Sequence, residues 1–210
     1  MTLDLENYIE KHISEEPPLL KTIDRLTNLR YINGRMCSGH IQGRLLKMLV
    51  AMAKPKRVLE LGTFTGYSAL CIAEALDEDA RLDTIEVDDE MEDVIIENFD
   101  RSPYGNKITL HIGDALEVIK QWGDEEFDMA FIDADKRKYP QYFRALLPLI
   151  SKRGFIIADN TLWDGHVTES GRHSSQTTGI MEFNNLVASM PGIEVSIIPV
   201  RDGMTIIRKL

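Results

Sequence analysis

Polar side chains that could bind a cation follow two apolar runs in the second half of the chain. Asp133 directly follows the run 127–132, and Asp159 and Asn160 directly follow the run 154–158. Carboxylate and amide oxygens are the ligands that Mg²⁺ prefers, with Ca²⁺ and Mn²⁺ as further candidates, whereas Zn²⁺ favours His or Cys. If the two runs are neighbouring strands, these oxygens lie together. The alternative is a pair of ordinary turns, in which Asp and Asn are common.

Two further residues near these oxygens could take part in chemistry. Lys136 lies shortly after Asp133, where a bound cation would disfavour its ammonium form and let it act as a general base. Trp163 lies just after Asn160 in a loop that contains glycine, where an aromatic ring could form one wall of a pocket for a flat substrate. The alternatives are a solvated lysine beside Arg137 and a tryptophan packed in the core.

A segment with two glycines, nearer the N-terminus, predicts a loop that binds a nucleoside. The apolar run 57–61 breaks at Gly62, and an apolar-periodic helix follows Gly66. This strand–turn–helix order is found where α/β sheets bind nucleotides, although the spacing lacks the middle glycine of the dinucleotide fingerprint. Glu60 in the strand favours a positively charged cofactor such as S-adenosylmethionine. The alternative is a turn that needs glycine only for its backbone.

An acidic residue at the end of the next strand-like run supports a nucleoside cofactor. Glu86 ends the run 82–86 and follows Gly66 by about 20 residues, the spacing at which a carboxylate can accept both hydroxyls of a ribose. The glycine loop and Glu86 together therefore predict an adenosine-containing ligand.

The elements that position these residues alternate between apolar runs and helical patterns. Near-continuous apolar runs such as 127–132 are typical of parallel strands covered on both faces. Because the segment 201–203 is too short for a crossover helix, the last two strands form a hairpin. We therefore predict an α/β fold with a doubly wound, seven-stranded, mostly parallel sheet and an antiparallel last strand. The strands are expected near 57–61, 82–86, 107–111, 127–132, 154–158, 193–199 and 204–208, and the helices between them near 67–76, 89–99, 115–121, 139–150 and 177–190.

The first part of the chain carries helical patterns only. Amphipathic patterns cover 3–12 and 39–53, and a further helix can begin at Pro17 and Pro18. We expect one domain over 1–210, with a helical N-terminal extension over 1–53 and a catalytic α/β core over 54–210, because 210 residues suit a single core.

Composition excludes several classes of function. A net charge of −10 disfavours nucleic acid and anionic membranes as partners. Cys37 and Cys71 lie in apolar contexts and are expected to be buried, reduced thiols. The acidic N-terminus lacks the pattern of a signal peptide, and no apolar run reaches membrane-spanning length. We therefore expect a cytoplasmic protein.

Taken together, these segments resemble the cation-dependent O-methyltransferases, the family that includes the catechol and caffeoyl-coenzyme A O-methyltransferases. The resemblance extends from about Pro17 to Leu210. Its motifs occur in the order and spacing of the family: ELGTFTGYSA (60–69), TIEVDD (84–89), GDALEVI (113–119), IDADKRKY (132–139), ADNTLWDG (158–165) and PVRDGMTIIRK (199–209).

The resemblance implies that S-adenosylmethionine binds around the glycine loop. Glu86 would take the ribose hydroxyls, and Asp114 and Ala115 would lie near the adenine. Asp133 would line the cofactor site as well. The residues that would hold or cover the methionine portion are Met36, Ser38, Glu60, Gly62, Thr63 and Ser68.

The resemblance also implies metal-dependent methylation of a catechol-like or other hydroxylated aromatic molecule. Lys136 matches the lysine proposed as base in the catechol enzymes, and Trp163 and Asp202 match residues that contact the acceptor in plant members. Arg201 stands where a small residue is usual, and the segment 167–176 is shorter than in plant enzymes, so the natural acceptor is left open. The residues that match the metal ligands are Asp133, Asp159 and Asn160.

Apolar N-terminal helices and the family resemblance favour a homodimer, and the alternative is a monomer whose N-terminal helices fold back on the core. Two other functions stay open. A nucleotide-dependent oxidoreductase is disfavoured by the absent GxGxxG motif and by the terminal hairpin. A non-catalytic cofactor-binding protein is disfavoured by the complete set of Asp133, Lys136, Asp159 and Asn160.

Overall fold

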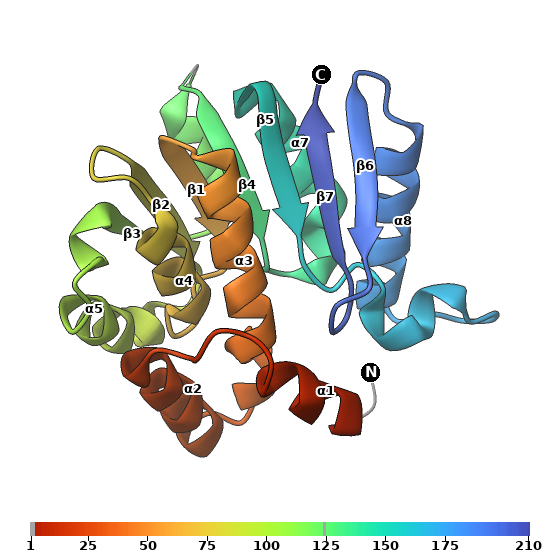
Figure 1. The fold of residues 1–210 in the computed structure, drawn as a ribbon. Coiled ribbons are helices and arrows are strands. Elements are labelled where there is room, and N and C mark those ends of the chain that lie inside the picture. Colours follow the sequence, from red (N-terminus) through yellow and green to blue (C-terminus); the bar gives the residue numbers. More distant parts are fainter. Residues whose placement is uncertain (1–2, 124) are drawn as a thin grey trace. The chain divides into compact units, whose positions relative to one another are not determined.

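A seven-stranded sheet organises the protein in the computed structural model, which describes residues 3–123 and 125–210. The strand order is β3-β2-β1-β4-β5-β7-β6 (Figure 1). β7 runs antiparallel to both of its neighbours, whereas β4 is parallel to β1 and β5, and β2 is parallel to β3. The mostly parallel sheet with an antiparallel last strand is therefore confirmed. The strands are β1 (Arg57–Leu61), β2 (Arg81–Glu86), β3 (Ile108–Ile112), β4 (Phe127–Ile132), β5 (Ile150–Ala158), β6 (Ile193–Ile198) and β7 (Met204–Lys209).

One strand boundary differs clearly from the sequence prediction. β5 begins at Ile150, whereas the apolar run predicted a start near residue 154. The polar residues at the beginning of β5 obscured it, because the pairing with β4 is irregular there and Arg153 has a left-handed φ of 70°. A bulge of this kind lets polar residues belong to a strand without following its alternation.

The chain divides into two compact units. The first comprises Met1–Lys56 and Thr63–Ile112, and the second comprises Arg57–Gly62 and Gly113–Leu210. The chain therefore passes from one unit to the other inside the glycine loop, between Gly62 and Thr63. A single domain over 1–210, with an extension over 1–53, stays a prediction.

Helices dominate the first unit. The predicted N-terminal helices are present, although the first ends at Glu10 instead of His12. Helix α3 packs closely on α4, since a Cβ atom added at Gly43 would lie 2.7 Å from the sulfur of Cys71. Cys37 and Cys71 are both buried and remain reduced thiols, as predicted. The helices of this unit are α1 (Leu3–Glu10), α2 (Pro18–Arg30), α3 (Gly39–Ala53), α4 (Tyr67–Ala75) and α5 (Glu92–Asp100), with a 3-10 turn η1 (Gly34–Met36).

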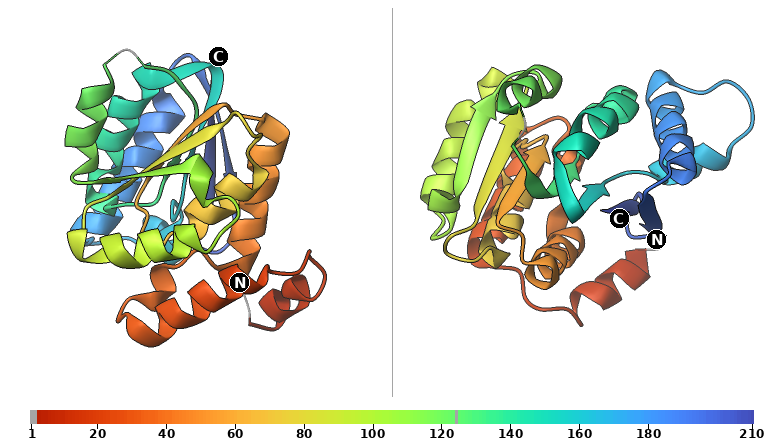
Figure 2. Two further views of the ribbon diagram at one scale, coloured as in Figure 1. Left: turned by 90° about the vertical axis from the view of Figure 1, so that its left-hand side faces the viewer. Right: turned by 90° about the horizontal axis from the view of Figure 1, so that it is seen from above.

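The second unit places two long helices on one face of its strands. Figure 2 (right) shows α7 (Tyr139–Leu149) and α8 (Ser175–Ser189) side by side along β4, β5 and β6. Phe143 of α7 and Phe183 of α8 are fully buried and pack edge to face. The unit also contains α6 (Ala115–Ile119) and the 3-10 turns η4 (Lys120–Trp122), η5 (Lys136–Lys138) and η6 (Trp163–Thr168).

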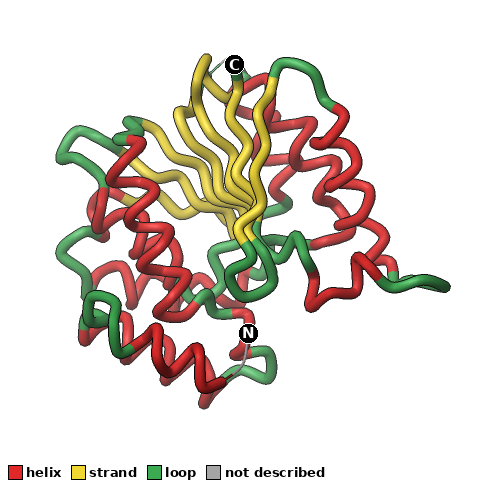
Figure 3. The backbone as a smooth tube through the Cα atoms, turned by 45° about the vertical axis from the view of Figure 1, so that its right-hand side comes forward, coloured by secondary structure: helices red, strands yellow, loops and turns green. Residues whose placement is uncertain are grey.

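The loop after β5 and the turn between β6 and β7 lie at the same end of this unit (Figure 3). This end carries the residues singled out in the second half of the sequence. Among the described residues, no helix combines the length and apolarity that crossing a membrane requires.

Candidate active site

Three strand ends of the second unit are level with one another. Leu61, Ile132 and Ala158 are paired across β1, β4 and β5, so the residues that follow them emerge side by side. The Asp133 amide donates to the carbonyl of Leu61 at 2.9 Å, and the Asp159 amide donates to the carbonyl of Ile132 at 2.9 Å. The structure therefore brings the two predicted carboxylates to adjacent strand ends.

The lysine predicted as base contacts one of these carboxylates. Lys136 Nζ donates to Asp133 Oδ1 at 2.6 Å, and both side chains are mostly buried, with exposed fractions of 12% and 16%. Lys136 lies in η5, against which α8 packs closely, because a Cβ atom added at Gly179 would lie 2.4 Å from the Lys136 carbonyl oxygen. The plainer interpretation of Lys136 as a solvated lysine is thus wrong for this structure.

The third predicted metal ligand is anchored by the terminal hairpin. Asn160 has a left-handed φ of 57°, and its Nδ2 donates to Asp202 Oδ2 across 3.4 Å. This orientation leaves Oδ1 as the amide atom that can ligate a cation. The carbonyl of Asp202 accepts from the amides of Leu162 and Trp163 at 2.7 and 3.2 Å. The β6–β7 turn therefore fixes the loop that carries Asn160 and the half-buried Trp163.

The donor set fits a hard divalent cation. It consists of the carboxylates of Asp133 and Asp159 and the amide of Asn160, all oxygen ligands, with no His or Cys among them. Within residues 3–123 and 125–210, no group of three His, Cys, Asp or Glu side chains could hold a metal ion. A site here would therefore depend on the Asn160 amide and on oxygens from water or substrate.

Two predicted cofactor residues lie on β1 or directly after it. Glu60 is fully buried within the strand. Gly62 has a φ of +94°, and a Cβ atom there would lie 2.0 Å from the Asp133 carbonyl oxygen. The structure thus requires glycine at this position for the backbone conformation and for the close approach of Asp133, whether or not a cofactor is bound.

The predicted adenine contacts form the start of α6. Asp114 caps this helix by accepting from the Leu116 amide at 2.9 Å, and it accepts from Lys138 Nζ at 2.7 Å. The hydrogen bond from Lys138 holds the pKa of the Asp114 carboxyl below its ordinary value. Ala115 is buried as the first residue of α6.

In the first unit, Glu86 organises the glycine loop. Its Oε2 accepts from the amides of Thr63 and Phe64 at 3.1 and 2.7 Å. Its Oε1 accepts from the amides of Val87 and Asp88 at 2.9 and 3.0 Å. The structure therefore gives this predicted ribose ligand a second role, because its carboxylate holds the loop backbone in place.

The other predicted cofactor residues of the first unit differ in exposure. Thr63 and Ser68 are buried, and so is Ser38. The side chain of Met36 in η1 is 53% exposed. The Thr63 amide contacts Glu86 directly, and the cofactor roles assigned to all five of these residues stay predictions.

Sequence reasoning missed the residues of the second unit that hold the loops after β4 and β5 in place. Thr161, directly after Asn160, is held by Asn184 Nδ2, which donates to its carbonyl at 2.7 Å, and by Thr205 Oγ1, which donates to its hydroxyl at 2.7 Å. Tyr139 is fully buried at the start of α7. A tyrosine directly after a charged loop was the available signal, but nothing in the sequence indicated which atoms its hydroxyl would meet.

Burial and, next, the charges of Asp133 and Asp159 raise the pKa of Tyr139 well above its ordinary value. This shift favours the protonated phenol, which can donate a hydrogen bond.

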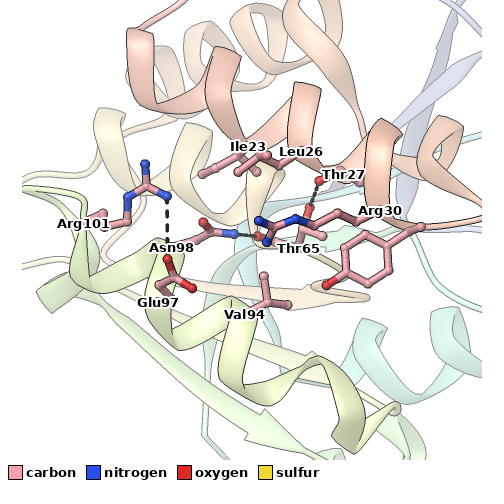
Figure 4. Close-up of a pocket in the computed structure, with 10 residues that line it drawn as sticks. Ile23, Leu26, Thr27, Arg30, Thr65, Val94, Glu97, Asn98 and Arg101 are labelled. Carbon is pink, nitrogen blue, oxygen red and sulfur yellow. Dashed lines mark hydrogen bonds and ion pairs between the residues drawn. The ribbon is translucent and has the colours of Figure 1, made fainter.

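A small pocket lies elsewhere in the first unit, between α2 and α5 (Figure 4). Arg30 and Arg101 stand at its sides, and Asn98 Nδ2 donates to the Thr65 carbonyl at 3.0 Å. None of the site residues predicted from the sequence lines this pocket. Asn98 and Thr27, which both line the pocket, therefore hold the glycine loop through hydrogen bonds to Thr65.

Comparisons with known proteins place the chain in one family. The family model for O-methyltransferase matches residues 10–210. The caffeoyl-CoA O-methyltransferase of Petroselinum crispum is 30% identical, with 93% of this chain and 85% of that protein covered. The catechol O-methyltransferase of Niastella koreensis is 34% identical, with 75% and 72% covered.

Solved structures agree with this assignment. The O-methyltransferase TomG of Streptomyces achromogenes, solved in complex with S-adenosylmethionine, superimposes with a TM-score of 0.90 at 26% identity. The match covers 98% of this chain and 96% of the TomG chain. The family match spans both units, and these relatives displace the oxidoreductase and non-catalytic alternatives. The chain belongs to the O-methyltransferase family and is an S-adenosylmethionine-dependent O-methyltransferase.

Proposed function

We propose that this enzyme methylates a phenolic hydroxyl of a catechol-like aromatic molecule, with a divalent cation held by Asp133, Asp159 and Asn160. The observation that supports the proposal is that the residues with these two carboxylates and this amide directly follow the level ends of the neighbouring strands β4 and β5. The names of the two relatives, caffeoyl-CoA and catechol O-methyltransferase, denote acceptors with adjacent hydroxyl groups. Such a pair of oxygens suits the open positions of an oxygen-ligated cation.

The three donors suit Mg²⁺ best. When bound, the ion acts as a Lewis acid that eases loss of a proton from an acceptor hydroxyl, whose pKa as a free phenol is about 10. With one oxygen from each of these three side chains, an octahedral ion would have room for two acceptor oxygens. An acceptor held through both oxygens is fixed in orientation, and orientation is among the largest contributions to a group transfer.

In this proposal, Lys136 receives the acceptor proton. Its Nζ lies 2.6 Å from Asp133 Oδ1, next to the proposed ligands. A dication beside it would disfavour the ammonium form through charge repulsion and favour the neutral amine. Trp163 and Asp202, tied together by the Trp163 amide, would form the wall against which the aromatic ring lies.

S-adenosylmethionine supplies the methyl group. In the net reaction the phenolic oxygen bonds to the methyl carbon as the carbon–sulfur bond breaks, and the products are a methyl ether, S-adenosylhomocysteine and one proton. A negative oxygen and a positive sulfonium become neutral in this step, so exclusion of water favours it. The proposed cofactor ligands are those implied by the sequence, in the first unit Met36, Ser38, Thr63, Ser68 and Glu86, and in the second Glu60, Gly62, Asp114, Ala115 and Asp133.

A panel of acceptors tests this proposal. The purified enzyme, with S-adenosylmethionine and Mg²⁺, is offered aromatic compounds that carry two adjacent hydroxyls, two separated hydroxyls or one hydroxyl, and the products are identified by mass spectrometry. We expect a single methyl ether from the adjacent diols and little from the others. Equal turnover of all three classes would exclude chelation as the basis of acceptor recognition.

We also propose that two copies associate in the cytoplasm. The first unit exposes large apolar side chains on α1, α2 and α3, namely Leu5, Tyr8, Leu29, Met48 and Met52, and their burial would stabilise a dimer. Light scattering at micromolar concentration should give twice the mass of the chain, 23.9 kDa, and a monomeric mass would contradict the dimer. Fractionation of the native cells tests the location.

A further inference from the structure

The phenol of Tyr139 connects the two strand ends that carry the proposed metal ligands. Its hydroxyl is within hydrogen-bond distance of two carbonyl oxygens, that of Ile132 at 3.2 Å and that of Asp159 at 3.0 Å. The phenolic hydroxyl has a single hydrogen to donate, so this donor is shared between the ends of β4 and β5. Tyr139 is fully buried, so water does not compete for the hydroxyl.

The two carbonyl groups belong to the peptide units that determine where the proposed ligands point. The Ile132 carbonyl lies in the peptide that leads into Asp133. The Asp159 carbonyl lies in the peptide that joins Asp159 to Asn160. Since a peptide unit is planar, holding its oxygen fixes the dihedral angles on either side. One hydroxyl thus restricts the backbone at all three proposed ligands.

The Asn160 backbone shows why such a restraint is needed. Its φ of 57° lies in the left-handed region, which non-glycine residues occupy at a cost. The adjoining peptide oxygen is the one that accepts from Tyr139. Without that donor, the peptide could rotate toward a less strained conformation and change the direction in which the Asn160 side chain points.

The ring of Tyr139 contacts Lys136, which together with Asp133, Asp159 and Asn160 forms the proposed catalytic cluster. Lys136 Nζ lies 5.3 Å from the ring centroid, within the range of a cation–π interaction. The ring also packs edge to face on Phe183 of α8, with 5.5 Å between centroids. The ring is therefore held by the core of the second unit while its hydroxyl and face contact the cluster.

We propose that Tyr139 is a positioning residue that presets Asp133, Asp159 and Asn160 for cation binding. This inference rests on the proposed metal site. Tyr139 touches neither acceptor nor cofactor in this account and acts only through the peptides and the lysine that it contacts. Residues that orient metal ligands from behind commonly change metal affinity by about 10- to 100-fold when they are replaced.

The test compares Tyr139→Phe with a matched control, Tyr104→Phe. Phenylalanine keeps the ring, its packing on Phe183 and its contact with Lys136, and removes only the hydroxyl. Tyr104 also has a lysine over its ring, since Lys107 Nζ lies 5.5 Å from the centroid, but it lies in the first unit. Mn²⁺ affinity is measured by electron paramagnetic resonance titration of each full-length protein, without acceptor. Melting temperature and affinity for S-adenosylhomocysteine are measured in parallel.

We expect Tyr139→Phe to bind Mn²⁺ at least about 10-fold more weakly, and Tyr104→Phe to bind it as the wild type does. Higher Mg²⁺ should restore most of the kcat of Tyr139→Phe, because the ligands are displaced and not removed. Unchanged Mn²⁺ affinity, with or without a lower melting temperature, would overturn the inference and leave the metal site standing. A wild type that does not bind Mn²⁺ would overturn the metal site itself, and the inference with it.

Discussion

Carboxylates in the two units have different kinds of partners. Glu86 accepts from four backbone amides of neighbouring chain segments, and these donors cannot leave unless the loop unfolds. Asp133 accepts from the ammonium of Lys136, a flexible side chain that can move. A carboxylate paired with backbone amides shapes a loop, whereas one paired with a movable cation can exchange that partner for another.

This difference separates two residues that the sequence presents alike. Both Glu86 and Asp133 end or follow an apolar strand, and both are expected to contact a ligand. The structure shows that Glu86 holds the loop backbone through four hydrogen bonds. We therefore expect substitutions of Glu86 to affect folding and cofactor affinity together, and substitutions of Asp159 to affect cation binding and turnover while folding and cofactor affinity are kept.

The largest expected effect concerns Asp159. Asp159→Asn removes a charge from the proposed cation site, and we expect kcat/KM for methyl transfer to fall about 1000-fold, which corresponds to about 4 kcal/mol. Affinity for S-adenosylhomocysteine, measured by calorimetry, should stay within a factor of a few. Asp164→Asn is the matched control, because Asp164 is exposed on the same loop with a left-handed φ of 52° that Asn also tolerates. A fully active Asp159→Asn enzyme would remove the distinction between the two units.

The two glycines of the cofactor loop sharpen the comparison. A Cβ atom at Gly62 would lie 2.0 Å from a backbone oxygen, while one at Gly66 would lie 2.6 Å from the Phe99 ring, which can shift. We expect Gly62→Ala to lower the free energy of unfolding by about 3 kcal/mol and Gly66→Ala by about half as much, since both also strain a positive φ. Urea unfolding measures both values. Equal losses would show that the approach of Asp133 to Gly62 is not the deciding contact.

Glu86→Gln tests how much the hydrogen bonds of that carboxylate to backbone amides contribute to stability. A glutamine side chain would direct its NH₂ group at backbone donors and leave part of them without an acceptor. We expect the free energy of unfolding to fall by about 2 kcal/mol and the melting temperature by about 4–8 °C. Cofactor affinity should weaken as well. Glu90→Gln, on an exposed residue of the same unit, should change neither quantity, and a Glu86→Gln protein as stable as the wild type would contradict the assigned role.

The smallest effect concerns Asp114 and Lys138. The hydrogen bond from Lys138 holds the folded pKa of Asp114 below its ordinary value, so the pair stabilises the protein at pH values above the pKa of the unfolded carboxyl. This contribution is lost as the pH falls through the lower, folded pKa. Lys138→Gln should therefore be slightly less stable than the wild type at pH 7, and the gap in stability should begin to narrow below about pH 4 and vanish in stronger acid. Both side chains are partly exposed, which keeps the effect small. A gap that widens in acid would contradict the assignment.

Much of the fold could be predicted because short-range sequence patterns identify its strands and turns. The apolar run 127–132, the turn at 201–203 and the glycine positions each follow from short-range rules, and all seven strands were located from them. The start of β5 could not be located in this way, because its polar residues lie at an irregularity that depends on the pairing with β4.

The candidate site likewise has some residues that local patterns predict and others that depend on tertiary packing. Asp133 and Asp159 could be predicted as neighbours because strand ends in a parallel sheet meet at one edge. Their partners could not, since the contacts of Tyr139, Thr161 and Asn184 join segments far apart in the chain. Residue type and local spacing indicate which groups can do chemistry, whereas the groups that hold them in place depend on tertiary packing.

The dependence of turnover on a divalent cation tests the central claim most directly. The enzyme is freed of metal with EDTA, and methyl transfer from S-adenosylmethionine to a catechol is followed as Mg²⁺ is added back, with S-adenosylhomocysteine binding as the measure of an intact fold. We predict no turnover before the addition, recovery that saturates with Mg²⁺, and no recovery for Asp159→Asn. Full turnover in excess EDTA would contradict the account.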